Sequence, residues 1–121
     1  MSQSCTIFGD PIGKPRMTQR DVWKQRPCVL RYRAWCDLAR LAAFKKDRKL
    51  TLERPTTLIV KAYMPNGKQH RVGPHTVKPD MDNICKSVMD ALFTNDQMVY
   101  KLECQKLWCD GSRPRVELEW W

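Results

Sequence analysis

Four charged side chains lie close together in the sequence and are of the types that phosphodiester chemistry needs. Asp80 and Asp82 are separated by one residue, and Lys86 stands four residues after Asp82. Asp96 follows ten residues later. Carboxylates that converge repel one another unless a divalent cation lies between them, and Mg²⁺ prefers oxygen ligands of this kind. A lysine beside such a cation stabilises the charge that a phosphate gains during hydrolysis. The segment therefore contains the parts of a metal-dependent phosphodiesterase site.

The same spacing also has an ordinary structural explanation. Asp is common at helix N-termini, where it accepts hydrogen bonds from free N–H groups and favours the helix dipole. Asp82 and Lys86 would then form an i,i+4 ion pair worth about 0.3 kcal/mol. Asp96 lies beyond the helix expected over residues 81–93, so only tertiary packing can return it to the helix start. Spacing alone leaves both interpretations open.

The charge balance of the chain points to an acidic partner. The 121 residues carry a net charge of +9, which is typical of proteins that bind nucleic acid, with a membrane surface as the competing partner. Residues 1–54 contain 13 Lys or Arg and 5 Asp or Glu, whereas residues 55–121 contain 9 and 8. No apolar run approaches the ~20 residues that span a bilayer, and no signal-peptide pattern opens the chain. We therefore expect a cytoplasmic protein that binds nucleic acid and no membrane.

The six cysteines show no CxxC pair and no zinc-ligand spacing. Several stand inside apolar patterns, as small hydrophobic residues do. Because no secretion signal is present, we predict reduced thiols in preference to disulfides or metal ligands.

Periodicity predicts two helices and four strands. The helices are expected over residues 30–50 and 81–93, and the strands over residues 5–8, 57–63, 98–108 and 115–120. This order, β-α-β-α-β-β, predicts a single α+β domain over residues 1–121, with a mixed β-sheet and the helices packed against it. Asp110-Gly111 is expected to form a hairpin turn between the last two strands. The predicted buried face of the first helix consists of Leu30, Ala34, Leu38, Leu41, Ala42 and Phe44.

Two groups of basic residues are candidates for contact with nucleic acid. The first is a tract with one acid, Asp21, and we expect it to contact phosphates rather than form only a solvated loop. It contains Lys14, Arg16, Arg20, Lys24, Arg26, Arg31 and Arg33. The second group either grips the backbone beside the scissile phosphate or belongs to a disordered polar connection. It contains Lys68, Arg71, His75 and Lys78, which lead into the expected helix over residues 81–93.

Four tryptophans have candidate roles in binding or assembly. Trp23 is the best candidate for stacking on unpaired bases, whereas Trp35 is expected in the core or in a subunit interface. Trp120 and Trp121 are unusual residues to leave in water, and a subunit interface would explain them.

The sequence does not decide between two roles for two charged residues of the strand expected over residues 98–108. Glu103 and Lys106 alternate with Leu102 and Leu107. Cross-strand ion pairing is the default role of such residues, although either one could approach the candidate site.

The acidic segment resembles the signature of the RusA-type Holliday junction resolvases. The resemblance rests on residues 78–92, KPDMDNICKSVMDAL, followed by Asn95-Asp96 and Val99. Weaker similarities occur in the expected order along the chain. Gly9-Asp10-Pro11 with Lys14 and Arg16 resembles the family's opening strand and basic loop, and residues 114–118 are similar to its last strand.

The resemblance implies a homodimer that uses Mg²⁺, with Mn²⁺ as a substitute, to cut four-way DNA junctions by paired symmetric nicks in recombination and repair. Position by position, Asp80, Asp82 and Asp96 match the family's metal-binding carboxylates. Lys86 matches its essential lysine.

Two further positions of the resemblance bear on the site. Asp90 matches an acid of the family pattern, and we expect it to support the site by capping or pairing within the helix. The family often has paired acids before the following strand, whereas this chain has Asn95-Asp96. One carboxylate fewer is therefore available at this point.

Three other functions remain open from the sequence. A non-catalytic module for branched nucleic acid would bind a junction tightly without Mg²⁺-dependent cutting. A nuclease for flaps, forks or plain duplex would share the site and differ in substrate. A structural protein with capped helices would show no thermal shift with Mn²⁺.

Overall fold

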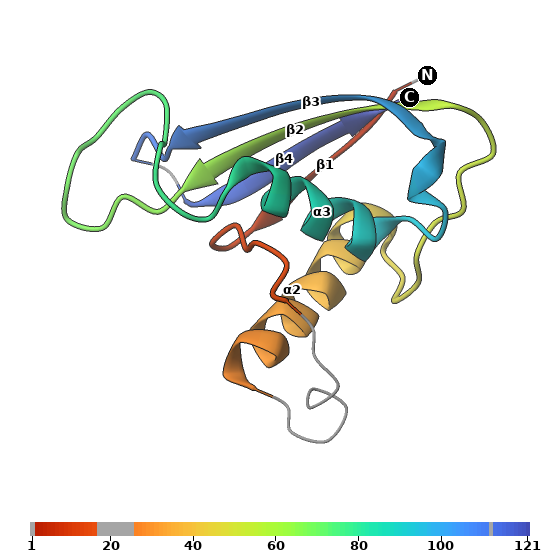
Figure 1. Ribbon diagram of the computed structural model, residues 1–121, viewed down its shortest axis with the longest axis horizontal. Coiled ribbons are helices and arrows are strands. Elements are labelled where there is room, and N and C mark those ends of the chain that lie inside the picture. The colour runs from red at the N-terminus through yellow and green to blue at the C-terminus, as the bar shows by residue number, and fades with distance from the viewer. Residues whose placement is uncertain (1, 17–25, 112) are drawn as a thin grey trace.

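A four-stranded sheet and two helices make up the fold in the computed structural model, which describes residues 2–16, 26–111 and 113–121 (Figure 1). The elements are β1 (Gln3–Phe8), α2 (Pro27–Phe44), β2 (Thr56–Met64), α3 (Met81–Leu92), the short 3₁₀ helix η1 (Asp96–Met98), β3 (Val99–Trp108) and β4 (Arg115–Trp120). The strand order is β1-β4-β2-β3, with β2 and β3 parallel and the other neighbours antiparallel. The predicted α+β class, mixed sheet and element order are confirmed.

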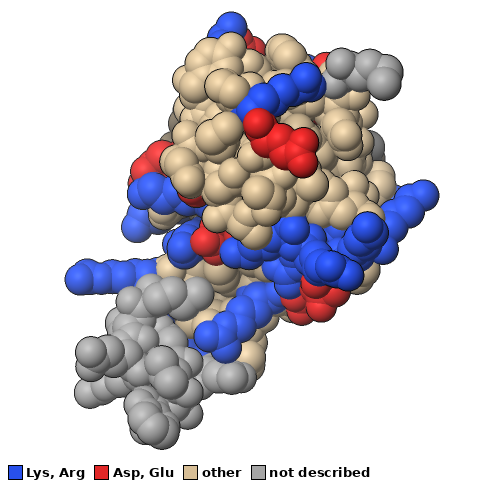
Figure 2. Space-filling view, turned by 90° about the vertical axis from the view of Figure 1, so that its right-hand side faces the viewer, with Lys and Arg blue, Asp and Glu red and all other residues tan. Residues whose placement is uncertain are grey.

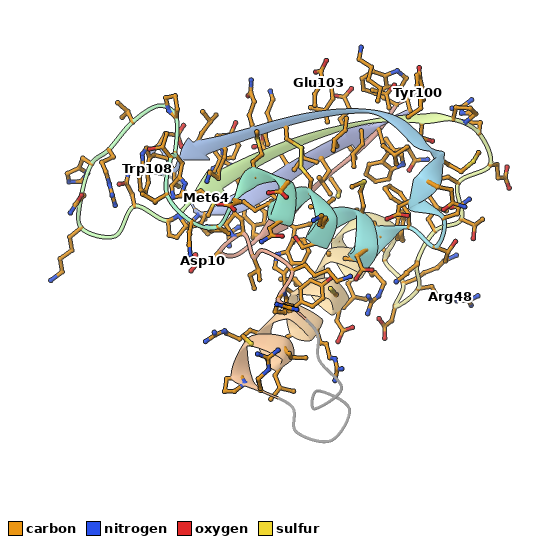
Figure 3. The ribbon with its side chains drawn as sticks, in the orientation of Figure 1. Asp10, Arg48, Met64, Tyr100, Glu103 and Trp108 are labelled. Carbon is orange, nitrogen blue, oxygen red and sulfur yellow. A yellow bond between two sulfur atoms is a disulfide. The ribbon has the colours of Figure 1, made fainter. Side chains whose placement is uncertain are left out.

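The core lies between one face of the sheet and the two helices (Figure 1). Leu58 and Val60 of β2 are buried there, together with Val88 and Leu92 of α3. The other face of the sheet carries polar residues, and Figure 3 shows Glu103 on this side, away from the helices. None of the described helices is long and apolar enough to cross a membrane.

The buried face of α2 differs from the predicted one. Leu30, Leu38 and Leu41 are exposed, as are Ala34 and Ala42, whereas Phe44 is half-buried. The residues that are buried instead are Val29, Tyr32, Trp35, Cys36 and Ala39. Apolar residues occur around most of this helix, so the pattern does not select a face, and the two large aromatic rings bury the greater area. The helix also ends at Phe44, because Lys45 adopts a left-handed conformation with φ of 56°.

The buried face of α3 is the predicted one. The prediction of reduced thiols is wrong for two cysteines, one on α3 and one on the neighbouring strand β3. Ile84, Val88, Ala91 and Leu92 are buried. Cys85 forms a disulfide with Cys104 of β3. The two cysteines are 19 residues apart and meet only because α3 packs back along β3. No spacing rule in the sequence reveals that packing.

The expected hairpin between the last two strands is not formed. β3 pairs with β2, and β4 pairs with β2 on its other side and with β1. Asp110-Gly111 therefore connects two strands that β2 separates, and Gly111 supplies a positive φ of 93° in this connection. Alternating residues identify a strand but not its neighbours.

The terminal tryptophans also divide between two environments. Trp120 is buried in the core of its own chain, with ring centroids 6.1 Å from Phe44 and 5.9 Å from Phe93. Its predicted interface role is therefore wrong, because the side chain is already covered. Trp35 is likewise buried in the core, whereas Trp121 is 43% exposed.

Candidate active site

The start of α3 exposes two carboxylates and one lysine. Asp80 is the N-cap residue, yet its side chain makes no capping hydrogen bond. Asp82 lies in the first turn, and the Lys86 ammonium lies 3.8 Å from its Oδ2. The side chains of Lys86 and Asp82 are 61% and 73% exposed, so this ion pair contributes little stability and leaves both groups accessible. Asp80, Asp82 and Lys86 thus share one solvent-facing end of the helix.

The loop after β1 packs against this half of α3. A side chain added at Gly13 would place its Cβ 3.2 Å from the Cβ atoms of both Asn83 and Pro79. The Lys14 N–H donates to the Asn83 carbonyl at 3.4 Å, and the buried Ser87 hydroxyl donates to the Ile12 carbonyl at 2.7 Å. The opening loop and the helix signature, which are far apart in the sequence, therefore form one contact surface.

The segment that leads into α3 is attached to the end of β3. The Lys106 ammonium donates to the carbonyls of Val77 at 2.6 Å and Pro79 at 2.7 Å. The Lys106 carbonyl in turn accepts the His75 N–H at 2.9 Å. Glu103 instead lies 3.9 Å from Lys101 of the same strand, on the face away from the helices (Figure 3). Of the two residues left open by the sequence, Lys106 is therefore the one that reaches the site.

Asp90 links three elements rather than capping or pairing within its own helix. The Tyr32 hydroxyl of α2 donates to Asp90 Oδ2 at 2.5 Å, and the Lys14 ammonium lies 3.4 Å from Oδ1. Partial burial acts to raise the pKa of Asp90, but Tyr32 and Lys14 outweigh it and hold the pKa below its ordinary value. Burial, reinforced by Asp90, raises the pKa of Tyr32. The ionised Asp90 carboxylate thus connects α3 to α2 and to the loop after β1.

Asp96 lies at the other end of α3. The helix has 12 residues, which corresponds to about 18 Å, and η1 follows its C-terminal end (Figure 1). Within the described residues, no group of three or more His, Cys, Asp or Glu side chains is placed to hold a metal ion. One chain therefore brings together Asp80, Asp82 and Lys86, but not Asp96.

Asn95 has a structural role that its sequence neighbourhood does not reveal. Its side-chain oxygen accepts the Leu52 N–H at 2.8 Å, and its side-chain nitrogen donates to the Leu52 carbonyl at 2.8 Å. A carboxylate could accept the first bond but could not donate the second. The amide therefore anchors the start of η1, and with it Asp96, to the segment before β2.

The predicted DNA-contact residues fall into different environments. Lys68 and Lys78 are exposed, and Arg26 donates to the Arg16 carbonyl at 2.7 Å. The Arg71 guanidinium stacks 3.7 Å from the Trp108 ring centroid and also donates to Asn66, so it is largely engaged within the protein. Arg20 and Lys24, like Trp23, lie outside the described residues.

His75 packs against Trp108 at the end of β3. The two ring centroids are 4.1 Å apart, and His75 is buried. Burial, with the nearby charges of Lys106 and Arg71, lowers the pKa of His75. A neutral, buried imidazole contributes to packing here rather than to phosphate contact.

A further basic cluster follows α2. Figure 2 shows Lys and Arg side chains gathered across the middle and lower part of one face of the molecule. All four members of the cluster are exposed, and they are Lys45, Lys46, Arg48 and Lys49. The helix expected over residues 30–50 contained all four residues, whereas α2 ends at Phe44 and the cluster lies beyond it.

Comparisons with known proteins identify the family of the chain. The family described as endodeoxyribonuclease RusA matches residues 9–119, a range that contains Asp80, Asp82, Lys86 and Asp96. The chain is also 29% identical over 133 aligned residues to the uncharacterized protein YqaN of Bacillus subtilis (strain 168), covering 93% of this chain and 91% of the relative. Because the family match extends over nearly the whole chain, the protein belongs to the RusA family of endodeoxyribonucleases.

Proposed function

We propose that the protein is a divalent-metal-dependent endonuclease that resolves four-way DNA junctions by paired nicks, in recombination and repair. The observation that carries the proposal is the start of α3, where two exposed carboxylates stand beside an exposed lysine. The Asp80 carboxylate makes no capping bond and is available to another ligand. Membership of an endodeoxyribonuclease family supports the reaction class.

The donor groups at the start of α3 suit a hard divalent cation. Mg²⁺ commonly binds one or two carboxylates, while waters and substrate phosphate oxygens fill its remaining positions. Asp80 and Asp82 provide such carboxylates, and Mn²⁺ accepts the same ligands. A bound cation would activate water for attack and neutralise charge on the phosphate. Lys86 would turn from Asp82 toward the phosphate and stabilise the charge that develops there.

A second copy of the chain would supply the missing third carboxylate. β3 is an edge strand of the sheet and runs antiparallel to α3 (Figure 1). It therefore begins next to Asp96 and ends next to the segment that carries Asp80. A two-fold axis across the middle of β3 would bring Asp96 of each copy to the start of α3 in the other. The homodimer would then hold two identical sites.

The edge of β3 before Lys106 has side chains that suit such pairing, whereas residues 73–75 already bond to the edge at Lys106 and Trp108. Tyr100 is 71% exposed and Leu102 is 41% exposed. Lys101 and Glu103 lie on the same face of the strand. If the two strands pair antiparallel with Leu102 opposite its own copy, each Lys101 lies opposite Glu103 of the other chain. Pairing would thus cover apolar surface, match charges and remove an exposed sheet edge.

Basic side chains on the helix side of the sheet would bind the arms of the junction. The cluster Lys45, Lys46, Arg48 and Lys49 is exposed there. Lys68 is also exposed, as is Lys78, which stands two residues before Asp80. Contacts of this kind release counterions, so affinity should fall steeply with salt. A symmetric dimer would present its two sites to two strands of a junction with matching symmetry.

The test is cleavage of a labelled synthetic four-way junction by wild type and Asp82→Asn, with Mg²⁺ or with EDTA. We expect paired nicks from wild type with Mg²⁺ and none from Asp82→Asn, which should still bind the junction because it has lost a negative charge. Glu119→Gln is the matched control, since it removes an exposed carboxylate from a different face of the sheet and should cut normally.

The outcome also separates the other functions. Tight junction binding by wild type without any cutting would favour a non-catalytic binding module. Faster cutting of three-way or linear DNA than of the junction would reassign the substrate. Loss of junction binding in folded Asp82→Asn would contradict the assignment of Asp82 as a metal ligand.

A further inference from the structure

We propose that Lys106 is a positioning residue for the two carboxylates at the start of α3, an inference that rests on the proposed metal-dependent function. Its ammonium donates to the carbonyls of Val77 and Pro79, at 2.6 and 2.7 Å. Both carbonyls belong to the three residues that precede Asp80. Lys106 thus acts on the backbone that carries the carboxylates, without being a metal ligand itself.

The position of Lys106 in the sheet directs its side chain toward the site. It lies opposite Ala62 of β2. Ala62 is buried in a cluster with Met64 of β2 and Ile84 of α3. Lys106 therefore projects from the helix-covered face, where it is half-buried. A charged ammonium in such a position must be satisfied by acceptors, and the two carbonyls provide them.

The backbone of β3 also binds residues 73–75, which precede the residues bound by the Lys106 side chain. The His75 N–H donates to the Lys106 carbonyl and the Trp108 N–H donates to the Gly73 carbonyl, both at 2.9 Å. These main-chain bonds fix residues 73–75, whereas the Lys106 side chain extends the attachment to Pro79. A substitution of Lys106 can therefore release the last residues before Asp80 and leave the main-chain attachment in place.

This attachment matters because no hydrogen bond within the described part of the chain fixes the Asp80 carboxylate. The N-cap side chain makes no capping hydrogen bond, so its direction follows from the backbone at Pro79 and Asp80. Asp80 and Asp82 repel each other before a cation binds. A backbone held by Lys106 keeps them at a separation that suits the cation and lowers the cost of bringing them together.

The experiment compares wild type with Lys106→Met, which removes the donors, and Lys106→Arg, which keeps charge and donors. Lys61→Met is the control, because Lys61 is exposed on the opposite face of the sheet. Mn²⁺ binding to each protein is measured by electron paramagnetic resonance, and junction binding is measured by gel shift in EDTA. We expect Lys106→Met to weaken Mn²⁺ binding about tenfold, with Lys106→Arg recovering most of the loss and Lys61→Met unchanged. Junction affinity in EDTA should stay within about twofold.

Several results would overturn the inference. Unchanged Mn²⁺ affinity in Lys106→Met, with or without a lower Tm, would mean that the side chain has only a structural role. Weaker junction binding in EDTA, with a shallower salt dependence, would make Lys106 a phosphate contact. If Lys106→Met does not fold, Lys106→Ala removes the same donors with a smaller side chain, and wild-type Mn²⁺ affinity in that variant would overturn the inference.

The failure of the proposed function is distinguishable from the failure of this inference. A wild type that binds Mn²⁺ and cuts no DNA would refute the nuclease proposal, while the titrations would still decide on Lys106. A wild type that cuts junctions, alongside a Lys106→Met variant with normal Mn²⁺ affinity, would refute the role of Lys106 alone. A wild type that binds no Mn²⁺ would overturn both.

Discussion

Replacing Asn95 by Asp should destabilise this chain. The amide of Asn95 makes two hydrogen bonds of 2.8 Å with the backbone of Leu52, one as acceptor and one as donor. Asn95→Asp keeps the acceptor for the Leu52 N–H. It replaces the donor by a carboxylate oxygen that faces the Leu52 carbonyl.

The expected cost follows from that exchange. Loss of one hydrogen bond costs about 1 kcal/mol, and leaving the Leu52 carbonyl beside an unsatisfied, negatively charged oxygen adds about 1 kcal/mol, for a total of about 2 kcal/mol.

The same geometry determines whether the variant gains or loses stability as the pH changes. The new carboxyl can donate to the Leu52 carbonyl only when it is protonated, so its pKa should be raised in the folded state. The variant should therefore regain stability toward acid and lose it as the pH rises.

Urea unfolding of wild type and Asn95→Asp, followed by tryptophan fluorescence at pH 7 and near pH 4, measures both effects. Gln97→Glu is the matched control, because it adds the same charge to an exposed position of η1. We expect Gln97→Glu to change stability by less than about 0.5 kcal/mol. An Asn95→Asp variant as stable as wild type at pH 7 would refute the role assigned to the amide. An equal loss in Gln97→Glu would attribute the effect to charge alone.

Two further predictions concern the packing behind the site and the proposed homodimer. Tyr32→Phe should destabilise the protein by about 1.5 kcal/mol at neutral pH, because the Asp90 carboxylate loses its hydroxyl donor. The pKa of Asp90 is lowered in the folded state. The stability from the Tyr32–Asp90 hydrogen bond should therefore be present above about pH 3.9 and be lost as the pH falls through the folded-state pKa. Urea unfolding at a series of pH values would measure this change. A pH-independent difference would point to packing instead. Leu102→Arg should convert the proposed homodimer to a monomer in light-scattering chromatography, whereas Leu38→Arg, on the exposed face of α2, should leave it intact. The reverse result would move the interface from β3 to α2.

The sequence was sufficient to predict the elements whose signals are local. α3 follows from a strongly one-sided apolar pattern that ends at Leu92, and its carboxylates are adjacent because they belong to one helix start. Asp80, Asp82 and Lys86 were therefore predicted together, and the structure places them together. α2 had apolar residues on several sides, so the exposed stripe of Leu30, Leu38 and Leu41 was mistaken for its buried face.

The contacts that the sequence could not predict join residues distant in the chain. Lys106 and Pro79 are 27 residues apart, Asn95 and Leu52 are 43 apart, and Tyr32 and Asp90 are 58 apart. The same reason explains the missed disulfide and the wrong hairpin, because both depend on which strand lies next to which. Asp96 illustrates the limit most clearly. The sequence predicted that a helix separates it from Asp82, but it could not predict whether tertiary packing returns Asp96 to the helix start.

The two faces of the sheet differ in charge, and this difference has a kinetic consequence. Basic residues such as Arg48 lie on the side that carries the helices (Figure 3). On the face that is free of helices, Glu103, Glu117 and Glu119 are balanced by basic residues that include Lys61 and Lys101. A molecule charged in this uneven way experiences a torque in the field of DNA before contact. It would approach DNA with the helix-covered side of the sheet facing the phosphates, so a larger fraction of collisions would lead to binding. Added salt should then slow association more than it speeds release.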